Sequence, residues 1–250
     1  MRSLVGLLLS LVFTTGVFAG VTYDFQTSVE TARFQEKITG RVWSEGDNYR
    51  AEIVRADGKR QIVISRDRDV SAMVVDPQKQ TWSNRVRVGN GVRSASLFLW
   101  PIGKPELRGK PEVTYQRGAT EVIAGQNAVE HVIEAKFRVM SRSDDSPVHG
   151  WYQLRARIWT AEELPALPMN TALRTGYAKI DEELDRHSAN VQGMVLRHEL
   201  EVTRTLEGGP EVKEKTTTVV TSLSSSPIDE AQFTVPDEFT YVGPEALTRK

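Results

Sequence analysis

Apolar and polar residues alternate with a period of two through most of the chain, and this pattern constrains the fold more than any other feature. In the run YRAEIV, for example, Tyr49, Ala51 and Ile53 alternate with Arg50 and Glu52. Successive side chains of a strand point to opposite faces, so such runs are typical of antiparallel strands with one apolar face. Longer runs of the same kind occupy residues 129–139, 152–159 and 194–202.

Short polar turns separate the early alternating runs and predict adjacent hairpins. The turns read SEGDN at 44–48, ADGK at 56–59 and DPQK at 76–79. The dipeptide Asp57-Gly58 predicts a type I′ turn, in which both central residues take a positive φ. The first half of the chain is therefore expected to be a meander.

Helical periodicity is scarce in the 250 residues. The clearest helix candidate contains Leu173, Tyr177, Ile180 and Leu184 at three-to-four spacing. No internal repeat or long linker divides the chain, so residues 20–245 are expected to form one domain, followed by a tail at 246–250. The pattern predicts a mainly β (α+β) fold, an unclosed antiparallel sheet plugged by one or two helices.

The first nineteen residues, Met1–Ala19, read as a secretory signal peptide. Arg2 precedes the apolar run LVGLLLSLVF, and small residues stand at Val17 and Ala19, where signal peptidase reads. The alternative is an uncleaved N-terminal anchor. Since the chain has no cysteine, it lacks the attachment residue of a bacterial lipid anchor and any disulfide. We therefore expect a soluble periplasmic protein that is not lipid-anchored.

Residue patterns for covalent chemistry are missing from the sequence. It has no cysteine nucleophile, no GxSxG elbow and no HExxH pair. His131 and His198 both fall in the apolar register of a strand. They either meet as ligands or as an acid–base pair, or each is buried with its ring nitrogens hydrogen-bonded, and we favour burial. We predict no enzyme activity, no cofactor, no metal site and no nucleic-acid partner.

Several short motifs resemble those of the LolA-like periplasmic proteins. They are Arg50-Ala51-Glu52 after Tyr49, Val74-Val75-Asp76-Pro77 before Trp82, TEVIAGQNAVEH at 120–131, IWTAEEL at 158–164, and the ending PIDEAQFTVPDEFTYV with its F-x-V-P-x-x-[FY] pattern. The resemblance implies an unclosed β-barrel of about eleven strands, apolar inside and partly plugged by helices. Members of this superfamily carry lipoproteins, transport acyl lipids or sense envelope damage. A LolA carrier locks its lid with a specific arginine, for which no counterpart is assigned here.

Apolar strand faces and this resemblance together predict a protein that binds a hydrophobic ligand, such as a lipid acyl chain or an acylated protein, for transfer or sensing. The helix around Leu173–Leu184 would be its lid. An alternative is an envelope interaction or sensor module with a self-filled barrel, acting on a protein partner through the basic stretch Arg41–Arg117. A hydrolase-type enzyme using His131 and His198 is the third possibility. The residues expected to line the concave face are Tyr23, Phe25, Val42, Tyr49, Ile53, Ile62, Ile64, Met73 and Trp82.

The C-terminal stretch SPIDEAQFTVPDEFTYV predicts a closing clasp. Pro227 cannot donate a ladder hydrogen bond and is expected to end a strand, and Pro236 turns the chain again. We expect Phe233 to be buried, and Phe239 and Tyr241 to form a short edge strand or a tucked coil that covers apolar surface.

Overall fold

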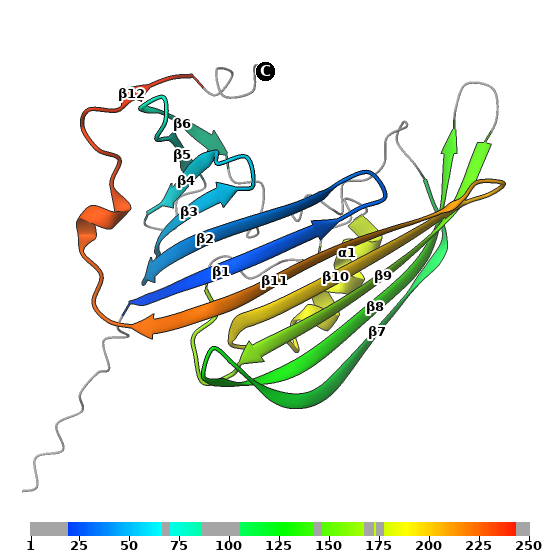
Figure 1. The fold of residues 1–250 in the computed structure, drawn as a ribbon. Helices are drawn as coiled ribbons and strands as arrows, with labels where there is room; N and C mark the ends of the chain where they lie inside the picture. Colours follow the sequence, from blue (N-terminus) through cyan, green and yellow to red (C-terminus); the bar gives the residue numbers. More distant parts are fainter. Residues whose placement is uncertain are drawn as a thin grey trace, which may run out of the picture.

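One open sheet of twelve strands dominates the molecule (Figure 1). The computed structural model describes residues 20–66, 71–86, 106–142, 147–167, 173 and 178–243. The strands are β1 (Val21–Glu30), β2 (Gln35–Glu45), β3 (Asn48–Arg55), β4 (Arg60–Ser65), β5 (Ser71–Asp76), β6 (Thr81–Val86), β7 (Glu106–Ile123), β8 (Gln126–Arg142), β9 (Pro147–Ala161), β10 (Met194–Leu206), β11 (Glu211–Ser225) and β12 (Thr240–Tyr241). Their spatial order is β12-β6-β5-β4-β3-β2-β1-β11-β10-β9-β8-β7.

Strand pairing is antiparallel throughout except at β12, which runs parallel to β6. The N-terminal strand β1 lies between β2 and β11, so the first half of the chain and the second half form one continuous sheet. The predicted mainly β, unclosed fold is confirmed, with twelve described strands where about eleven were expected.

The helix α1 (Ala178–Ser188) lies on one face of the sheet, which we call the helix face; the opposite face is the outer face. Ile180 and Leu184 are fully buried in a cluster with Leu173 and with inward side chains of β8, β9 and β10. The predicted helix is thus confirmed from residue 178 onward, while 174–177 lie outside the described residues. Packing of this apolar stripe, rather than the short helix itself, stabilises α1.

One hairpin turn differs from the expected pattern. Arg55 and Arg60 flank the predicted turn, but only Gly58 has a positive φ, of 78°, so the type I′ assignment for Asp57-Gly58 is wrong. The Asp57 carboxylate instead accepts a hydrogen bond from the Lys59 amide at 3.0 Å, which stabilises a longer loop. Among the described residues, both φ values are positive in the two-residue turn Ala124-Gly125, between β7 and β8.

Residues 226–243, which we call the C-terminal segment, cross the outer face of β3–β6 (Figure 1). β11 ends at Ser225, two residues before Pro227, as expected. Phe233 lies in a short 3₁₀ turn and is only 1% exposed, so its predicted burial is confirmed. Tyr241 belongs to β12 and closes the β6 edge, which confirms the expected short edge strand.

The expected signal peptide at 1–19 and the tail at 246–250 lie outside the described residues. Within the part of the chain that the structure describes, no helix is both long and apolar enough to span a bilayer.

Candidate functional site

The helix face of β1, β2 and β3 carries a continuous group of apolar side chains. Residues directly opposite each other in a sheet share a face, and the register pairs Tyr23 with Val42, and Val42 with Ala51. One pleat further along, Phe25 faces Gly40, which in turn faces Ile53. The β1–β3 apolar surface consists of Tyr23, Phe25, Val42, Tyr49, Ala51 and Ile53.

Burial within the β1–β3 apolar surface changes from its centre to its rim. Val42, Tyr49 and Ala51 are at most 1% exposed, whereas Phe25 and Ile53 are only half-buried. The rings of Tyr23 and Phe25 meet with centroids 6.5 Å apart and a tilt of 54°. Burial raises the pKa of the Tyr23 phenol, so this group stays neutral. The rim is therefore an uncharged, aromatic surface.

Gly40 makes room for the Phe25 ring. A Cβ atom at residue 40 would lie 2.5 Å from Phe25 Cε1 and would also meet the Glu52 carbonyl oxygen. The ring thus packs directly on the glycine backbone, where any side chain would push it away. The position of the Phe25 ring in the rim depends on this contact.

A polar row separates this surface from the core beneath α1. Thr27 Oγ1 and Thr218 Oγ1 are hydrogen-bonded at 2.8 Å, and Thr218 lies opposite His198. Among the described residues α1 packs mainly on β7 and β8, beyond this row. The β1–β3 apolar surface is thus distinct from the helix-covered core, although both lie on the helix face.

The two histidines of the apolar register do not form a pair. Both lie opposite Ile158, on either side of β9, which separates their Cα atoms by two strand spacings, or about 10 Å. His131 is fully buried, and its two ring nitrogens are hydrogen-bonded to the Tyr115 hydroxyl at 2.9 Å and the Thr160 hydroxyl at 3.0 Å. The favoured interpretation is therefore confirmed for His131.

His198 is buried as well, but Nε2 has no hydrogen-bond partner among the described residues. Burial lowers its pKa to about 4, and burial likewise lowers the pKa of His131. Both imidazoles are thus neutral at pH 7. No group of three or more potential metal ligands occurs in the described ranges.

Four of the nine residues expected on the concave face lie on the outer face instead. Glu52 is an outer-face residue, and the register places Ile62 opposite it and Val75 opposite Ile62. The expectation of one common face is therefore wrong for Ile62, Ile64, Met73 and Trp82, which pack under the C-terminal segment around Phe233. Tyr23, Phe25, Val42, Tyr49 and Ile53 do share the helix face.

The reason for this error is visible in β4 and β5. Residues Ile62, Val63 and Ile64 form an uninterrupted apolar run, as do Met73, Val74 and Val75. Such runs indicate a strand that is covered on both faces. Choosing every second residue of β4 and β5 therefore could not show whether those side chains meet the cover on the helix face or the cover on the outer face.

The R-x-E motif of β3 has a structural role that sequence reasoning missed. Arg50 binds the Glu52 carboxylate at 2.6 Å, donates to the Gln232 carbonyl at 3.0 Å and stacks over Trp43 at 5.7 Å. It therefore ties the C-terminal segment to the outer face. In the sequence, the only indication of this contact was the C-terminal ending PIDEAQFTVPDEFTYV, which follows a run of polar residues.

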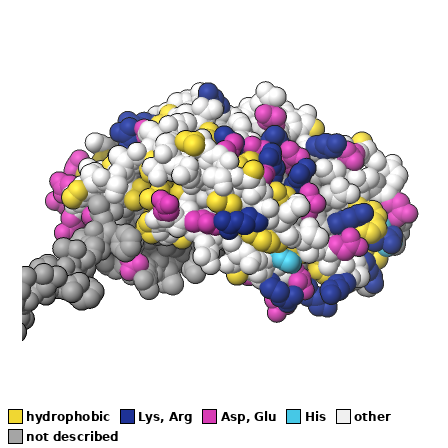
Figure 2. Space-filling model, turned by 90° about the horizontal axis from the view of Figure 1, so that it is seen from below, with side chains coloured by type: hydrophobic (Ala, Val, Ile, Leu, Met, Phe, Trp, Pro, Cys, Tyr) yellow, Lys and Arg dark blue, Asp and Glu magenta, His cyan; other side chains and the backbone are white. Residues whose placement is uncertain are grey.

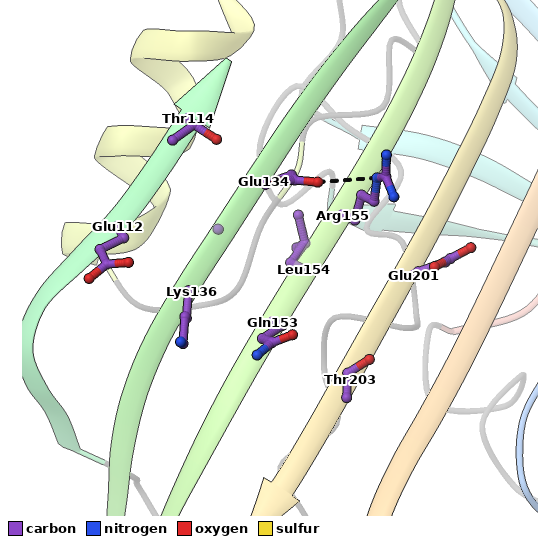
Figure 3. A pocket seen from close by; sticks show the side chains of 10 residues that line it. Glu112, Thr114, Glu134, Lys136, Gln153, Leu154, Arg155, Glu201 and Thr203 are labelled. Atoms are coloured by element: carbon purple, nitrogen blue, oxygen red, sulfur yellow. Dashed lines mark ion pairs between the residues drawn. The ribbon is translucent and has the colours of Figure 1, made fainter. Parts of the chain in front are cut away.

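A polar hollow of about 430 Å³ lies on the outer face over β7–β10 (Figure 3). Charged side chains of both signs line it, and Arg155 pairs with Glu134 at 3.2 Å. The labelled carboxylates, amide and hydroxyls point outward from neighbouring strands, so the hollow is open and hydrophilic. Most of its lining is charged or polar, so it offers little apolar surface to an acyl chain.

No protein-family model matches the chain, and no curated protein matches it. Among solved structures, the chain is similar to the crystal structure of a domain named for outer membrane lipoprotein sorting, from Vibrio parahaemolyticus, with 9% identity and a TM-score of 0.30. The match covers 86% of this chain and 89% of that chain. A TM-score of this size supports no conclusion about function.

Proposed function

We propose that this protein is a periplasmic binding protein for a hydrophobic ligand, a lipid acyl chain or an acylated protein, which it transfers or senses without covalent chemistry. The β1–β3 apolar surface would hold the ligand. The observation that supports this proposal is the half-buried aromatic rim formed by Tyr23 and Phe25, together with Ile53, on the same face as α1.

The chemistry of this rim suits an acyl chain. Apolar side chains gain about 25 cal/mol for each Å² that a ligand removes from water. The rings are uncharged, and the neighbouring hydroxyl groups of Thr27 and Thr218 are hydrogen-bonded to each other. The outer face of the same strands is polar by contrast: Arg41 holds Asp24 through two bonds, of 2.6 and 2.9 Å. The LolA-like motifs of the sequence point to the same class of ligand and to the periplasm.

Native mass spectrometry tests the proposal on protein purified from the periplasm, alone and after addition of a phospholipid or a synthetic lipopeptide. We expect a mass increment that corresponds to one acylated molecule. A chain that is purified empty and ignores both added compounds contradicts the proposal and favours a self-filled interaction module.

Phe25 and Phe34 form a matched pair for the binding test because both belong to the β1–β2 hairpin. Phe34 is 54% exposed in the turn, whereas Phe25 lies in the apolar rim. Phe25→Glu should reduce uptake about tenfold or more, since it places a charge against the acyl chain, and Phe34→Glu should not. Equal uptake by both variants would remove the ligand from the β1–β3 apolar surface.

A further inference from the structure

Two cations lie over an exposed tryptophan on the outer face of β8 and β9, and a third lies on the neighbouring strand β7. Trp151 is 45% exposed. Lys136 Nζ lies 5.2 Å from its ring centroid and Arg138 Cζ lies 5.8 Å from it. Arg108 is directly opposite Arg138 in the β7–β8 register. We call Arg108, Lys136, Arg138 and Trp151 the Trp151 surface.

The surface collects positive charge where a sheet alone would not. Like charges directly opposite each other destabilise a strand pair, yet Arg108 faces Arg138. Arg138 Nε also has no hydrogen-bond partner among the described atoms. Arg108 Nη2 donates to Met140 Sδ at 3.3 Å. An anion above this group of cations would offset the repulsion between the charges that face each other.

Carboxylates near this surface are mostly engaged with other cations. Glu134 pairs with Arg155 at 3.2 Å, and Glu201 lies 3.6 Å from Lys215. Glu112 lies opposite Lys136 in the register. Among the described residues, the three cations of the Trp151 surface therefore outnumber Glu112, the one carboxylate that lies directly opposite any of them in the β7–β8 register, and an anionic partner is the complement of this excess.

The surface also stands on the part of the sheet that projects furthest. Glu30, the last residue of β1, lies opposite Lys215 of β11. Lys215 lies opposite Glu201 of β10, and Glu201 lies opposite Arg155 of β9, so the four residues form one row across the sheet. Trp151 is four residues beyond this row, or about 13 Å along the strand. Figure 1 shows β8–β11 extending past the β1–β2 hairpin. In Figure 2, basic side chains flank a hydrophobic patch toward the right-hand end of the view, with acidic ones beside them.

We propose that the Trp151 surface docks the protein on an anionic phospholipid membrane. A tryptophan prefers the interface of a bilayer, where its ring is half in water. Lysine and arginine side chains place their apolar stems against the surface and their charges among lipid phosphates. Trp151 stands at the end of the sheet that extends past the β1–β2 hairpin, where a flat partner can reach its exposed ring. This docking does not depend on the β1–β3 apolar surface.

Sedimentation with vesicles tests the docking, using phosphatidylglycerol mixed into phosphatidylethanolamine and phosphatidylethanolamine alone. We expect the chain to bind the anionic vesicles, and a salt concentration of about 0.5 M to release most of it, because the Debye length shortens. Trp151→Ala and the double variant K136Q/R138Q should each lower the partition coefficient about tenfold or more.

Matched control variants separate this surface from total charge. K179Q/R186Q removes two positive charges from α1, and Val122→Ser removes an exposed apolar group from the far end of the β7–β8 hairpin. Both should bind vesicles as the unaltered chain does. Binding that is equal with and without phosphatidylglycerol, or an equal loss in the control variants, overturns the proposal, as does no binding at all. Vesicle binding that survives while acyl uptake fails would overturn the proposed function alone.

Discussion

The two ends of the sheet are covered on opposite faces. At β7–β9 the helix α1 packs on the helix face, and the outer face carries charge pairs and a polar hollow. At β3–β6 the C-terminal segment packs on the outer face around Phe233. Between these covers lies the helix face of β1–β3, with its half-buried aromatic rim. One continuous sheet thus buries opposite sides at its ends and leaves a half-buried apolar rim at the transition.

The outer cover should be the more costly one to disrupt. Phe233→Ala removes a 1% exposed ring from the cluster of Ile62, Ile64 and Val75 and should lower the free energy of unfolding by about 3–5 kcal/mol. Urea unfolding followed by circular dichroism measures this loss. Phe34→Ala, at a 54% exposed position, is the control and should change little. A negligible loss at Phe233 would show that the C-terminal segment is not a structural cover.

The helix cover should respond similarly but through the other face. Leu184→Ala creates a cavity beneath α1, where Leu184 is fully buried, and should cost about 3 kcal/mol. The same unfolding experiment measures it. Vesicle binding should persist in the folded variant, because the Trp151 surface lies on the opposite face. An unchanged stability would place α1 outside the core.

Gly40→Ala tests the transition between the two covers. The added methyl group would displace the Phe25 ring and press on the Glu52 carbonyl, at a cost of about 2 kcal/mol. Differential scanning calorimetry should show a lower melting temperature, and acyl uptake should weaken because the rim is rearranged. Gly46→Ala, where a Cβ meets no neighbouring atom, controls for the crowding but still carries strain from its φ of 57°. If Gly40→Ala costs no more than this control, the close contact is refuted.

Acidification should destabilise the protein partly through His198. Its pKa is about 4 in the fold and 6.5 as the ordinary value, so the unfolded chain binds the additional proton between these values. The stability is therefore fully present above pH 6.5 and is lost as the pH falls toward 4. Between pH 7 and pH 5 the loss from this residue should be about 1–2 kcal/mol. Urea titrations of the unaltered chain and of His198→Gln measure it; an identical pH dependence would contradict a buried, neutral His198.

Much of the fold follows from the alternation of the sequence. The strands, the helix that contains Ile180 and Leu184, and the burial of Phe233 all follow from local patterns of apolar residues. The pattern fails where β4 and β5 are apolar on both faces, because Ile62 and Val63 are equally suited to either side. Which side meets the C-terminal segment depends on pairing between residues far apart in sequence, such as Arg50 with Gln232.

The candidate site shows the same limit. Tyr23 and Phe25 were predicted together because they are two residues apart on one strand. Their separation from the helix-covered core by the Thr27–Thr218 pair required β1 to lie beside β11, which is 191 residues away at that contact. No local sequence signal specifies such a pairing. Turn conformation shows the same limit. In Asp57-Gly58 only the glycine has a positive φ, whereas both Ala124 and Gly125 have one, and composition alone did not indicate this difference.

Photocrosslinking with a diazirine-labelled fatty acid tests most directly whether the β1–β3 apolar surface binds an acyl chain. After irradiation, digestion and mass spectrometry locate the adducts along the chain. Adducts concentrated in β1 and β3, at residues 21–30 and 48–55, are the predicted result, and Phe25→Glu should abolish them. Adducts confined to the outer face of β8 and β9, or none in β1 and β3, would contradict the account.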